Sequence, residues 1–253
     1  MKNYIYILIS ISFLSSQSLF DQGVSEYNNR SMNSTNLLAS TTYIDKAIDS
    51  FEKNLDNNQK DNEQTIIYLL KSYYFKGEYA IEDVESKKEI FDMGKDLAEK
   101  YIPVYPKSAA IRYWYLVNLG SWAEVYGTLK AAREGVADIM KEQSEKIIDL
   151  NSEYKNGGGY FMLGAVHLKS PYIPFLLSWP SKKEAVKYLQ LAVDTKQASL
   201  VQKTYLAHAL YKTGEKEKAI ILLNEVINSK PSINDKVEDL NDINKAQKLL
   251  ETF

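Results

Sequence analysis

The chain has 253 residues and a formal net charge of −2, and hydrophobic residues make up 45% of it. That length is enough for one buried core or for a stack of several helix pairs. The small net charge disfavours nucleic acid as a partner, because phosphate backbones are bound by clustered positive charge. The absence of cysteine excludes disulfides, thiolate metal sites and cysteine nucleophiles.

The first twenty residues have the pattern of an export signal. A short start that contains Lys2 is followed by an apolar run over residues 4–14 and then by a serine-rich zone. The run is too short for a membrane span, which needs about 20 apolar residues. We therefore expect a periplasmic or secreted protein, with an uncleaved N-terminal anchor as the alternative. Residues 21–40 are rich in Asn and Ser and predict a flexible tether.

From residue 41 to residue 253 the apolar residues recur at helical spacing. Ala47 and Phe51 show this spacing in one segment, and Ile66, Leu70 and Tyr73 show it in the next. Glycines and prolines separate the helical segments, and no run alternates as a strand would. The pattern predicts an all-α domain over residues 41–253.

A repeat of 34 residues is visible late in the chain. The repeated pairs are Ala185 and Ala219, Leu189 and Leu223, Ala192 and Val226, Val193 and Ile227, and Lys196 and Lys230. Each copy is preceded by a large–small pair, Leu163-Gly164 or Leu206-Ala207. A small residue lets two helices approach closely, so these pairs predict the contact between the two helices of a unit.

This order resembles the tetratricopeptide repeat, which has the same period and the same sequence of small, apolar and proline positions. The match is strong over residues 200–231, moderate over 157–197 and looser toward the N-terminus. Such units bury their faces only against neighbouring units. The resemblance therefore implies a tetratricopeptide-like α-solenoid of about four helix pairs.

A closer resemblance covers residues 109–253 and is to the regulator of microtubule dynamics family. The features that carry it are Trp114-Tyr115, Gly127-x-x-Lys130, the run EKIIDLN at residues 145–151, Leu163-Gly164, and Ala246-Gln247-x-Leu249-Leu250. Ser152 departs from the pattern, since a repeat usually carries proline there. The resemblance implies a helical interaction domain, and some members of the family are linked to membranes and lipid.

A weaker resemblance is to the periplasmic T component of TRAP-type transporters, which are also exported helical repeats. Those proteins are typically anchored through a cysteine that carries lipid, and this chain has no cysteine.

The penultimate repeat unit contains an insertion. The spacing from Gly164 to Ala185 is 21 residues, whereas that from Ala207 to Ala219 is 12, and the extra residues lie within 169–181. The insertion is apolar, with Tyr172, Ile173, Phe175, Leu176, Leu177 and Trp179, and its three prolines prevent a continuous helix. We expect it to pack on the convex side or at an end of the solenoid, or alternatively to cover an apolar groove.

The sequence offers little that resembles catalysis. His167 and His208 lie 41 residues apart without an acidic cluster beside them, which is a poor metal site. The run from Gly157 to Gly159 lacks the lysine and preceding strand of a phosphate loop. Trp114, Trp122 and Tyr126 recur at helical spacing, which favours core positions, with a recognition stripe as the alternative. We therefore expect no enzyme activity, no cofactor and no metal.

The function that we predict is an exported scaffold that binds a protein or peptide in the concave groove of the solenoid. The alternative is a carrier or sensor of an apolar small molecule or lipid in a chamber lined by aromatic side chains. The candidate binding residues are Tyr160, Phe161, Phe175, Trp179, His208 and Tyr211. The sequence leaves the oligomeric state open.

Overall fold

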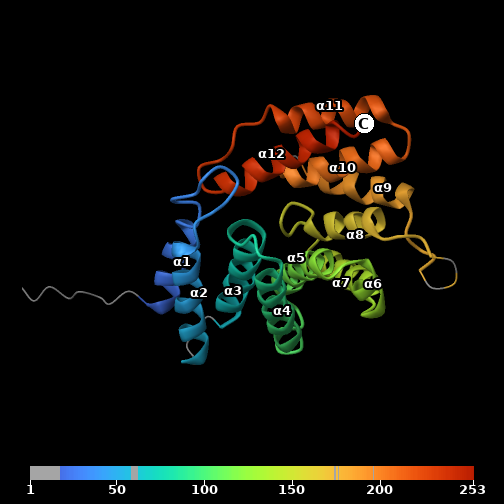
Figure 1. The fold of residues 1–253 in the computed structure, drawn as a ribbon. Helices are drawn as coiled ribbons and strands as arrows, with labels where there is room; N and C mark the ends of the chain where they lie inside the picture. The colour runs from blue at the N-terminus through green and yellow to red at the C-terminus, as the bar shows by residue number, and fades with distance from the viewer. Residues whose placement is uncertain (1–17, 58–61, 174, 176, 196) are drawn as a thin grey trace, which may run out of the picture.

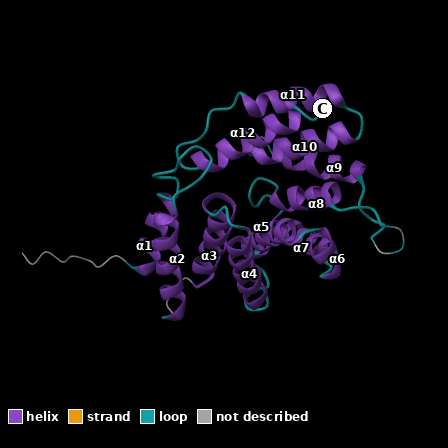
Figure 2. Cartoon of the chain, viewed as in Figure 1, coloured by secondary structure: helices purple, strands orange, loops and turns teal. Residues whose placement is uncertain are grey.

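The structure is a computed structural model that describes residues 18–57, 62–173, 175, 177–195 and 197–253. Residues 1–17, which carry most of the predicted export signal, lie outside the described residues. The described part is built from twelve α-helices and one short π-helix and contains no extended strand, so the all-α prediction is confirmed (Figures 1 and 2). No helix in this part is both long enough and apolar enough to cross a membrane.

The helices follow one another as a chain of antiparallel neighbours (Figure 1). They are α1 (Leu19–Asn28), α2 (Thr41–Asp56), α3 (Asn62–Phe75), η1 (Lys76–Ala80), α4 (Val84–Tyr101), α5 (Ala109–Tyr126), α6 (Thr128–Arg133), α7 (Val136–Asn151), α8 (Gly158–Lys169), α9 (Lys182–Val193), α10 (Leu200–Lys212), α11 (Lys216–Ile227) and α12 (Lys236–Leu250).

The helices pack as five pairs within the described residues: α1 with α2, α3 with α4, α5 with α7, α8 with α9, and α10 with α11. The first helices of successive pairs also contact one another, which makes α1, α3, α5, α8 and α10 the inner layer. The second helices form the outer layer, and α12 packs on α10 and α11. The solenoid prediction is confirmed, with one pair more than the four expected.

The additional pair comes from α1, in a segment where the sequence predicted a flexible tether. Ser18 caps this helix by accepting a hydrogen bond from the backbone N–H of Asp21 at 3.1 Å. Gly23 lies so close to the Phe51 ring that an added Cβ would be 2.5 Å from it. Tyr27 and Arg30 are buried. The sequence did not predict this helix, because α1 has few large apolar residues and the segment around it is rich in Asn and Ser.

The large–small pairs join helices as the repeat pattern predicted. A Cβ on Gly164 of α8 would lie 2.6 Å from the Leu189 side chain and 3.0 Å from its backbone nitrogen on α9. Ala207 of α10 is fully buried. Gly214 has a φ of +95°, a left-handed conformation that favours glycine, in the turn between α10 and α11.

The two ends of the solenoid contact each other, because α12 reaches the segment that follows α1 (Figure 1). Arg30 pairs with Asp235 and Glu238, and the Nδ2 of Asn241 donates a 2.8 Å hydrogen bond to the backbone oxygen of Leu37. The Nζ of Lys245 on α12 lies 2.7 Å from the Glu78 carboxylate on η1. The stack of pairs is therefore a closed arc whose concave side is formed by the inner layer and bordered by α12.

Candidate functional site

The six residues that the sequence nominated do not form one site. Phe161 is buried, and its ring packs edge-on against Tyr205 at 5.2 Å between centroids. Tyr160 is half-buried against the core. Tyr211 stacks on Phe253 at 3.7 Å, and its hydroxyl donates a 2.8 Å hydrogen bond to the backbone oxygen of Phe253. Phe161, Tyr160 and Tyr211 therefore hold helices together.

The insertion is fastened to the outer layer by Trp179. Its Nε1 donates a 2.7 Å hydrogen bond to the carboxylate of Asp138, on α7. The Lys141 ammonium, also on α7, lies 5.1 Å from the centre of the Trp179 ring. Phe175 is fully exposed on the loop, which projects from the body of the molecule (Figure 1). Phe175 therefore faces solvent, and Trp179 packs between Asp138 of α7 and His167 of α8.

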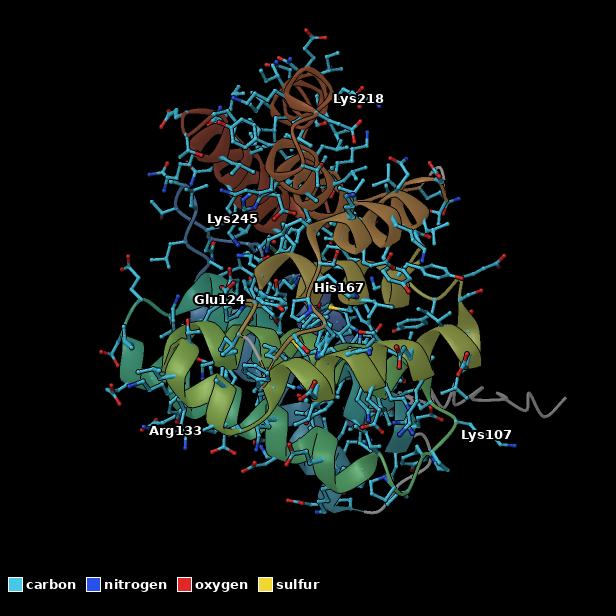
Figure 3. All side chains as sticks on the ribbon, turned by 90° about the vertical axis from the view of Figure 1, so that its right-hand side faces the viewer. Lys107, Glu124, Arg133, His167, Lys218 and Lys245 are labelled. Atoms are coloured by element: carbon cyan, nitrogen blue, oxygen red, sulfur yellow. The ribbon has the colours of Figure 1, made fainter. Side chains whose placement is uncertain are left out.

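His167 anchors the insertion from the other side and lies near the middle of the stack (Figure 3). Its Nδ1 accepts a 3.2 Å hydrogen bond from the backbone N–H of Ser181. The imidazole stacks on Tyr188 at 5.7 Å and meets the Trp179 ring edge-on at 5.0 Å. Burial lowers the pKa of His167. Its contacts are those of a neutral packing residue.

His208 is half-buried on α10 in a cationic environment. Burial lowers its pKa to about 4, and the charges of Lys212, Lys169 and Lys182 act in the same direction. The imidazole is therefore neutral near pH 7 and is a weak proton acceptor, because a general base works best with a pKa near the operating pH. In the described part of the chain, no group of three or more His, Asp or Glu side chains is placed to hold a metal ion.

The inner layer gathers a different set of side chains around Trp114, which we call the Trp114 cluster. Its members are Tyr27 of α1, Tyr68 and Lys71 of α3, Tyr113 and Trp114 of α5, and Tyr154 and Lys155 of the loop between α7 and α8. Segments from three successive helix pairs and one connecting loop therefore meet at this point of the concave side.

Lys71 is the central cation of the Trp114 cluster. Its Nζ lies 4.1 Å from the Tyr68 ring centre, 4.7 Å from that of Tyr27 and 6.0 Å from that of Trp114. Aromatic faces attract cations electrostatically, so these rings partly replace the lost water. They do not replace all of it, since burial lowers the pKa of Lys71 to about 8. The charges of Lys155 and Arg30 lower it further, and only Asp235 opposes them.

Lys155 approaches Trp114 from the connecting loop. Its Nζ lies 5.6 Å from the Trp114 ring centre, and its side chain is exposed. Beside it, Tyr154 packs edge-on against Tyr113 at 5.6 Å, and Tyr113 meets Trp114 edge-on at 5.4 Å. Burial raises the pKa of Tyr154 to about 12. The loop therefore adds an exposed cation and a neutral phenol to the cluster.

Sequence reasoning missed this cluster. Trp114 and Trp122 are buried as predicted, at 9% and 3% exposure, whereas Tyr126 is half-buried and its hydroxyl donates a hydrogen bond to Asp92. The available signal was Lys71 itself, the only charged residue in the run IIYLLKSYYF at positions 66–75. A lone lysine in an apolar helix either extends to water or enters a polar pocket, and periodicity does not separate the two cases.

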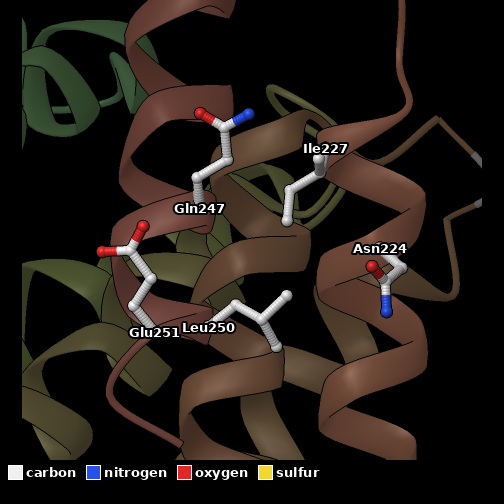
Figure 4. Close-up of a pocket in the computed structure, with 5 residues that line it drawn as sticks. All are labelled: Asn224, Ile227, Gln247, Leu250 and Glu251. Atoms are coloured by element: carbon white, nitrogen blue, oxygen red, sulfur yellow. The ribbon is translucent and has the colours of Figure 1, made fainter.

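An open pocket of about 410 Å³ lies elsewhere, between α11 and α12 (Figure 4). Its walls are the side chains of Asn224, Ile227, Gln247, Leu250 and Glu251. Glu251 is its one charged wall residue, and the pocket brings no second charged group beside it. It is a gap where the last two helices of the stack diverge, and it gives no chemical argument for a ligand.

A solved structure of a thermophilic tetratricopeptide-repeat protein from Thermus thermophilus is similar to this chain, with a TM-score of 0.57 and 12% sequence identity. The similarity covers 92% of this chain and 96% of that one. At this identity the likeness shows the fold alone, and it supports the tetratricopeptide-like solenoid. A comparison with curated proteins found no match.

A family model described as regulator of microtubule dynamics protein 1-3 matches residues 32–169. The sequence resemblance was placed at 109–253, so the match extends it into the N-terminal helix pairs and ends before the last repeats. The matched residues include Lys71, Trp114 and Lys155. Because the match covers more than half of the sequence, the chain belongs to the regulator of microtubule dynamics protein 1-3 family.

Proposed function

We propose that the chain is an exported, non-catalytic scaffold that binds a protein or peptide segment on its concave side. The observation that carries the proposal is the Trp114 cluster, in which one half-buried and one exposed lysine gather with aromatic side chains on the inner layer. Helical repeats of this kind form extended concave binding surfaces. A tyrosine or tryptophan held rigidly at such a surface loses little entropy on binding.

The inner layer has the physical character of a groove wall. Tyr74, Tyr113 and Tyr205 each keep part of their surface exposed, yet burial raises the pKa of all three. Protein surrounds most of each of these side chains, and only a part of each ring contacts solvent. Side chains of this kind on α3, α5 and α10 support a concave surface that runs along the stack.

The arrangement supports a peptide better than an apolar ligand. The carrier alternative needs a chamber lined by Tyr160, Phe161, Phe175 and Trp179, and these residues point to the core, to solvent and to α7. The large apolar side chains that are most exposed in the described part, Phe175, Ile233 and Leu129, lie on a loop, before α12 and on α6. The cluster itself contains rings, hydroxyls and ammonium groups, which suit backbone and charged groups of a polypeptide.

Site-specific cross-linking in cells tests the proposal. Glu124 of α5 is exposed and pairs with Lys169 of α8, and both helices belong to the inner layer. A photoreactive benzoylphenylalanine at position 124 therefore reports on the concave side. The same probe at Lys146, on the outer helix α7, is the matched control. We expect a discrete cross-linked partner from position 124 and none from position 146. Equal cross-linking from both positions, or from neither, would contradict a concave binding site.

Export is tested separately by fractionating cells that make the full chain. The proposal rests on the apolar run of residues 4–14 and on Lys2. We expect the protein in the periplasm or the medium, and retention in the cytoplasm after replacement of Leu8 and Phe13 by arginine. Recovery of the unaltered chain in the cytoplasm alone would remove the export part and leave the binding part standing.

A further inference from the structure

We propose that the Trp114 cluster is a carboxylate-binding site, in which Lys71 and Lys155 hold an acidic side chain or the terminal carboxylate of a partner polypeptide. This inference rests on the proposed function and names the chemistry that the concave side recognises.

The Trp114 cluster carries uncompensated positive charge. Lys71, Lys155 and Arg30 repel one another at this site. Arg30 is neutralised by Asp235 and Glu238, whereas the ammonium of Lys71 faces the rings of Tyr27, Tyr68 and Trp114. A half-buried cation that lacks a close carboxylate destabilises the free protein. A bound anion would remove this cost, so the site is arranged for an occupant that brings negative charge.

The two lysines of the cluster converge on one aromatic ring. The ammonium groups of Lys71 and Lys155 both lie within 6.0 Å of the same Trp114 ring centre. They come from different parts of the chain, one from the rigid inner helix α3 and one from the connecting loop before α8. Lys155 lies close enough to Lys71 for its charge to lower the pKa of Lys71, so a carboxylate beside the Trp114 ring would be attracted by both ammonium groups.

The walls of the cluster favour a polypeptide over a lipid. They are the phenol rings of Tyr27, Tyr68, Tyr113 and Tyr154, and a peptide backbone offers polar groups to such rings whereas an acyl chain offers none. Lys71 is half-buried behind these rings, and α12 borders the groove. Because Lys71 is half-buried, a flexible segment reaches its ammonium more readily than a flat membrane surface does. A flexible peptide can enter the groove, and its backbone suits the phenol hydroxyls.

Binding of fluorescein-labelled decaglutamate to the full chain, followed by fluorescence anisotropy, tests the site. The chain has a net charge of −2, so general electrostatic attraction does not favour this probe and binding requires a local site. We expect measurable binding that weakens with salt, a loss of at least tenfold in Lys71→Met and a loss of severalfold in Lys155→Met. Labelled decaglutamine with an amidated C-terminus has no carboxylate in the peptide, and it is the control that is expected not to bind.

The matched control variant is Lys141→Met. The Nζ of Lys141 lies 5.1 Å from the Trp179 ring centre, so it makes the same kind of cation–ring contact as Lys71, but on the outer layer. We expect unchanged decaglutamate binding in this variant. An unaltered or higher melting temperature of Lys71→Met would show that its loss of binding is not a loss of folding, because the substitution removes a desolvated charge.

Three results would overturn the site. They are an absence of binding to the parent chain, equal loss in Lys141→Met, and binding to vesicles with 30% phosphatidylserine that is lost in Lys71→Met while decaglutamate fails. The last result would reassign the cluster to an anionic lipid surface. If the partner captured through position 124 binds Lys71→Met with unchanged affinity, the carboxylate site is wrong and the concave scaffold remains.

Discussion

The Nε of Arg30 donates a 2.8 Å hydrogen bond to Oε1 of Glu238, and these two residues are 208 positions apart in the chain. Arg30 is 4% exposed, and its guanidinium also lies 4.4 Å from the Tyr27 ring centre. Burial raises the pKa of Glu238, while the nearby Arg30 charge opposes that rise. The pair therefore joins the first and last parts of the solenoid through a charge interaction that is largely shielded from water.

Arg30→Met should destabilise the protein strongly, because it leaves Glu238 buried without its cation. We expect a loss of about 3 kcal/mol in the free energy of unfolding, measured by urea denaturation, since removal of one partner of a buried pair has this order of cost. Lys53→Met breaks an exposed pair with Asp49 and should change the same quantity by less than about 0.5 kcal/mol. Similar small effects for both variants would show that the end-to-end contact is weak.

Asp242 makes the stability of the fold depend on pH. Burial raises its pKa to about 7, and Asp239, Glu78 and Glu238 act in the same direction against Lys245. The folded state therefore holds a proton that the unfolded state releases near pH 4, so the contribution of Asp242 to stability is full below pH 4 and is lost as pH rises through 7.

Asp242→Asn should abolish this dependence. At pH 8 we expect the variant to be more stable than the parent by on the order of 4 kcal/mol, with the difference shrinking as the pH falls and reaching zero below about pH 4. Thermal unfolding of both proteins at pH 5, 6, 7 and 8 measures it. A difference that is constant with pH would mean that Asp242 remains ionised throughout.

Two glycines in helix interiors should respond to alanine with opposite signs. A Cβ on Gly164 would lie 2.6 Å from the Leu189 side chain, whereas a Cβ on Gly120 would meet only Met140, at 3.7 Å. Gly164→Ala should destabilise the fold by about 2 kcal/mol through overpacking. Gly120→Ala should stabilise it by about 0.5 kcal/mol through helix propensity. Urea denaturation of the two variants checks this, and a stabilised Gly164→Ala would contradict the close contact of α8 with α9.

We expect the Trp179 side chain to hold the insertion, residues 169–181, against the helices. Trp179→Ala removes the hydrogen bond to Asp138 and the edge-on contact with His167. We expect amide exchange in residues 170–181 to accelerate by at least tenfold, while the exchange of α10 is unchanged. Phe175→Ala, at a fully exposed side chain, is the control and should leave both rates as they are. Equal exchange in the parent and Trp179→Ala would mean that other contacts hold the loop.

The repeat could be predicted from the sequence because the residues that define it lie within one unit or in adjacent units. The 34-residue period, the Leu163-Gly164 and Leu206-Ala207 pairs and the glycine at position 214 predicted helix pairs that the structure contains. Each signal concerns residues within one unit or between adjacent units. Helical periodicity and close approach at small residues need no information about distant parts of the chain, so both could be inferred before the fold was known.

The concave side was decided by tertiary structure, because its residues come from separate repeat units. Lys71 and Lys155 are brought to one ring by the packing of α3 and of the loop before α8 beside α5, and Arg30 reaches Glu238 only because the arc closes. Periodicity reports which face of a helix is buried, but not the angle at which one pair stacks on the next. That angle results from many small packing contacts summed along the solenoid. It determines which side chains of neighbouring units surround Lys71.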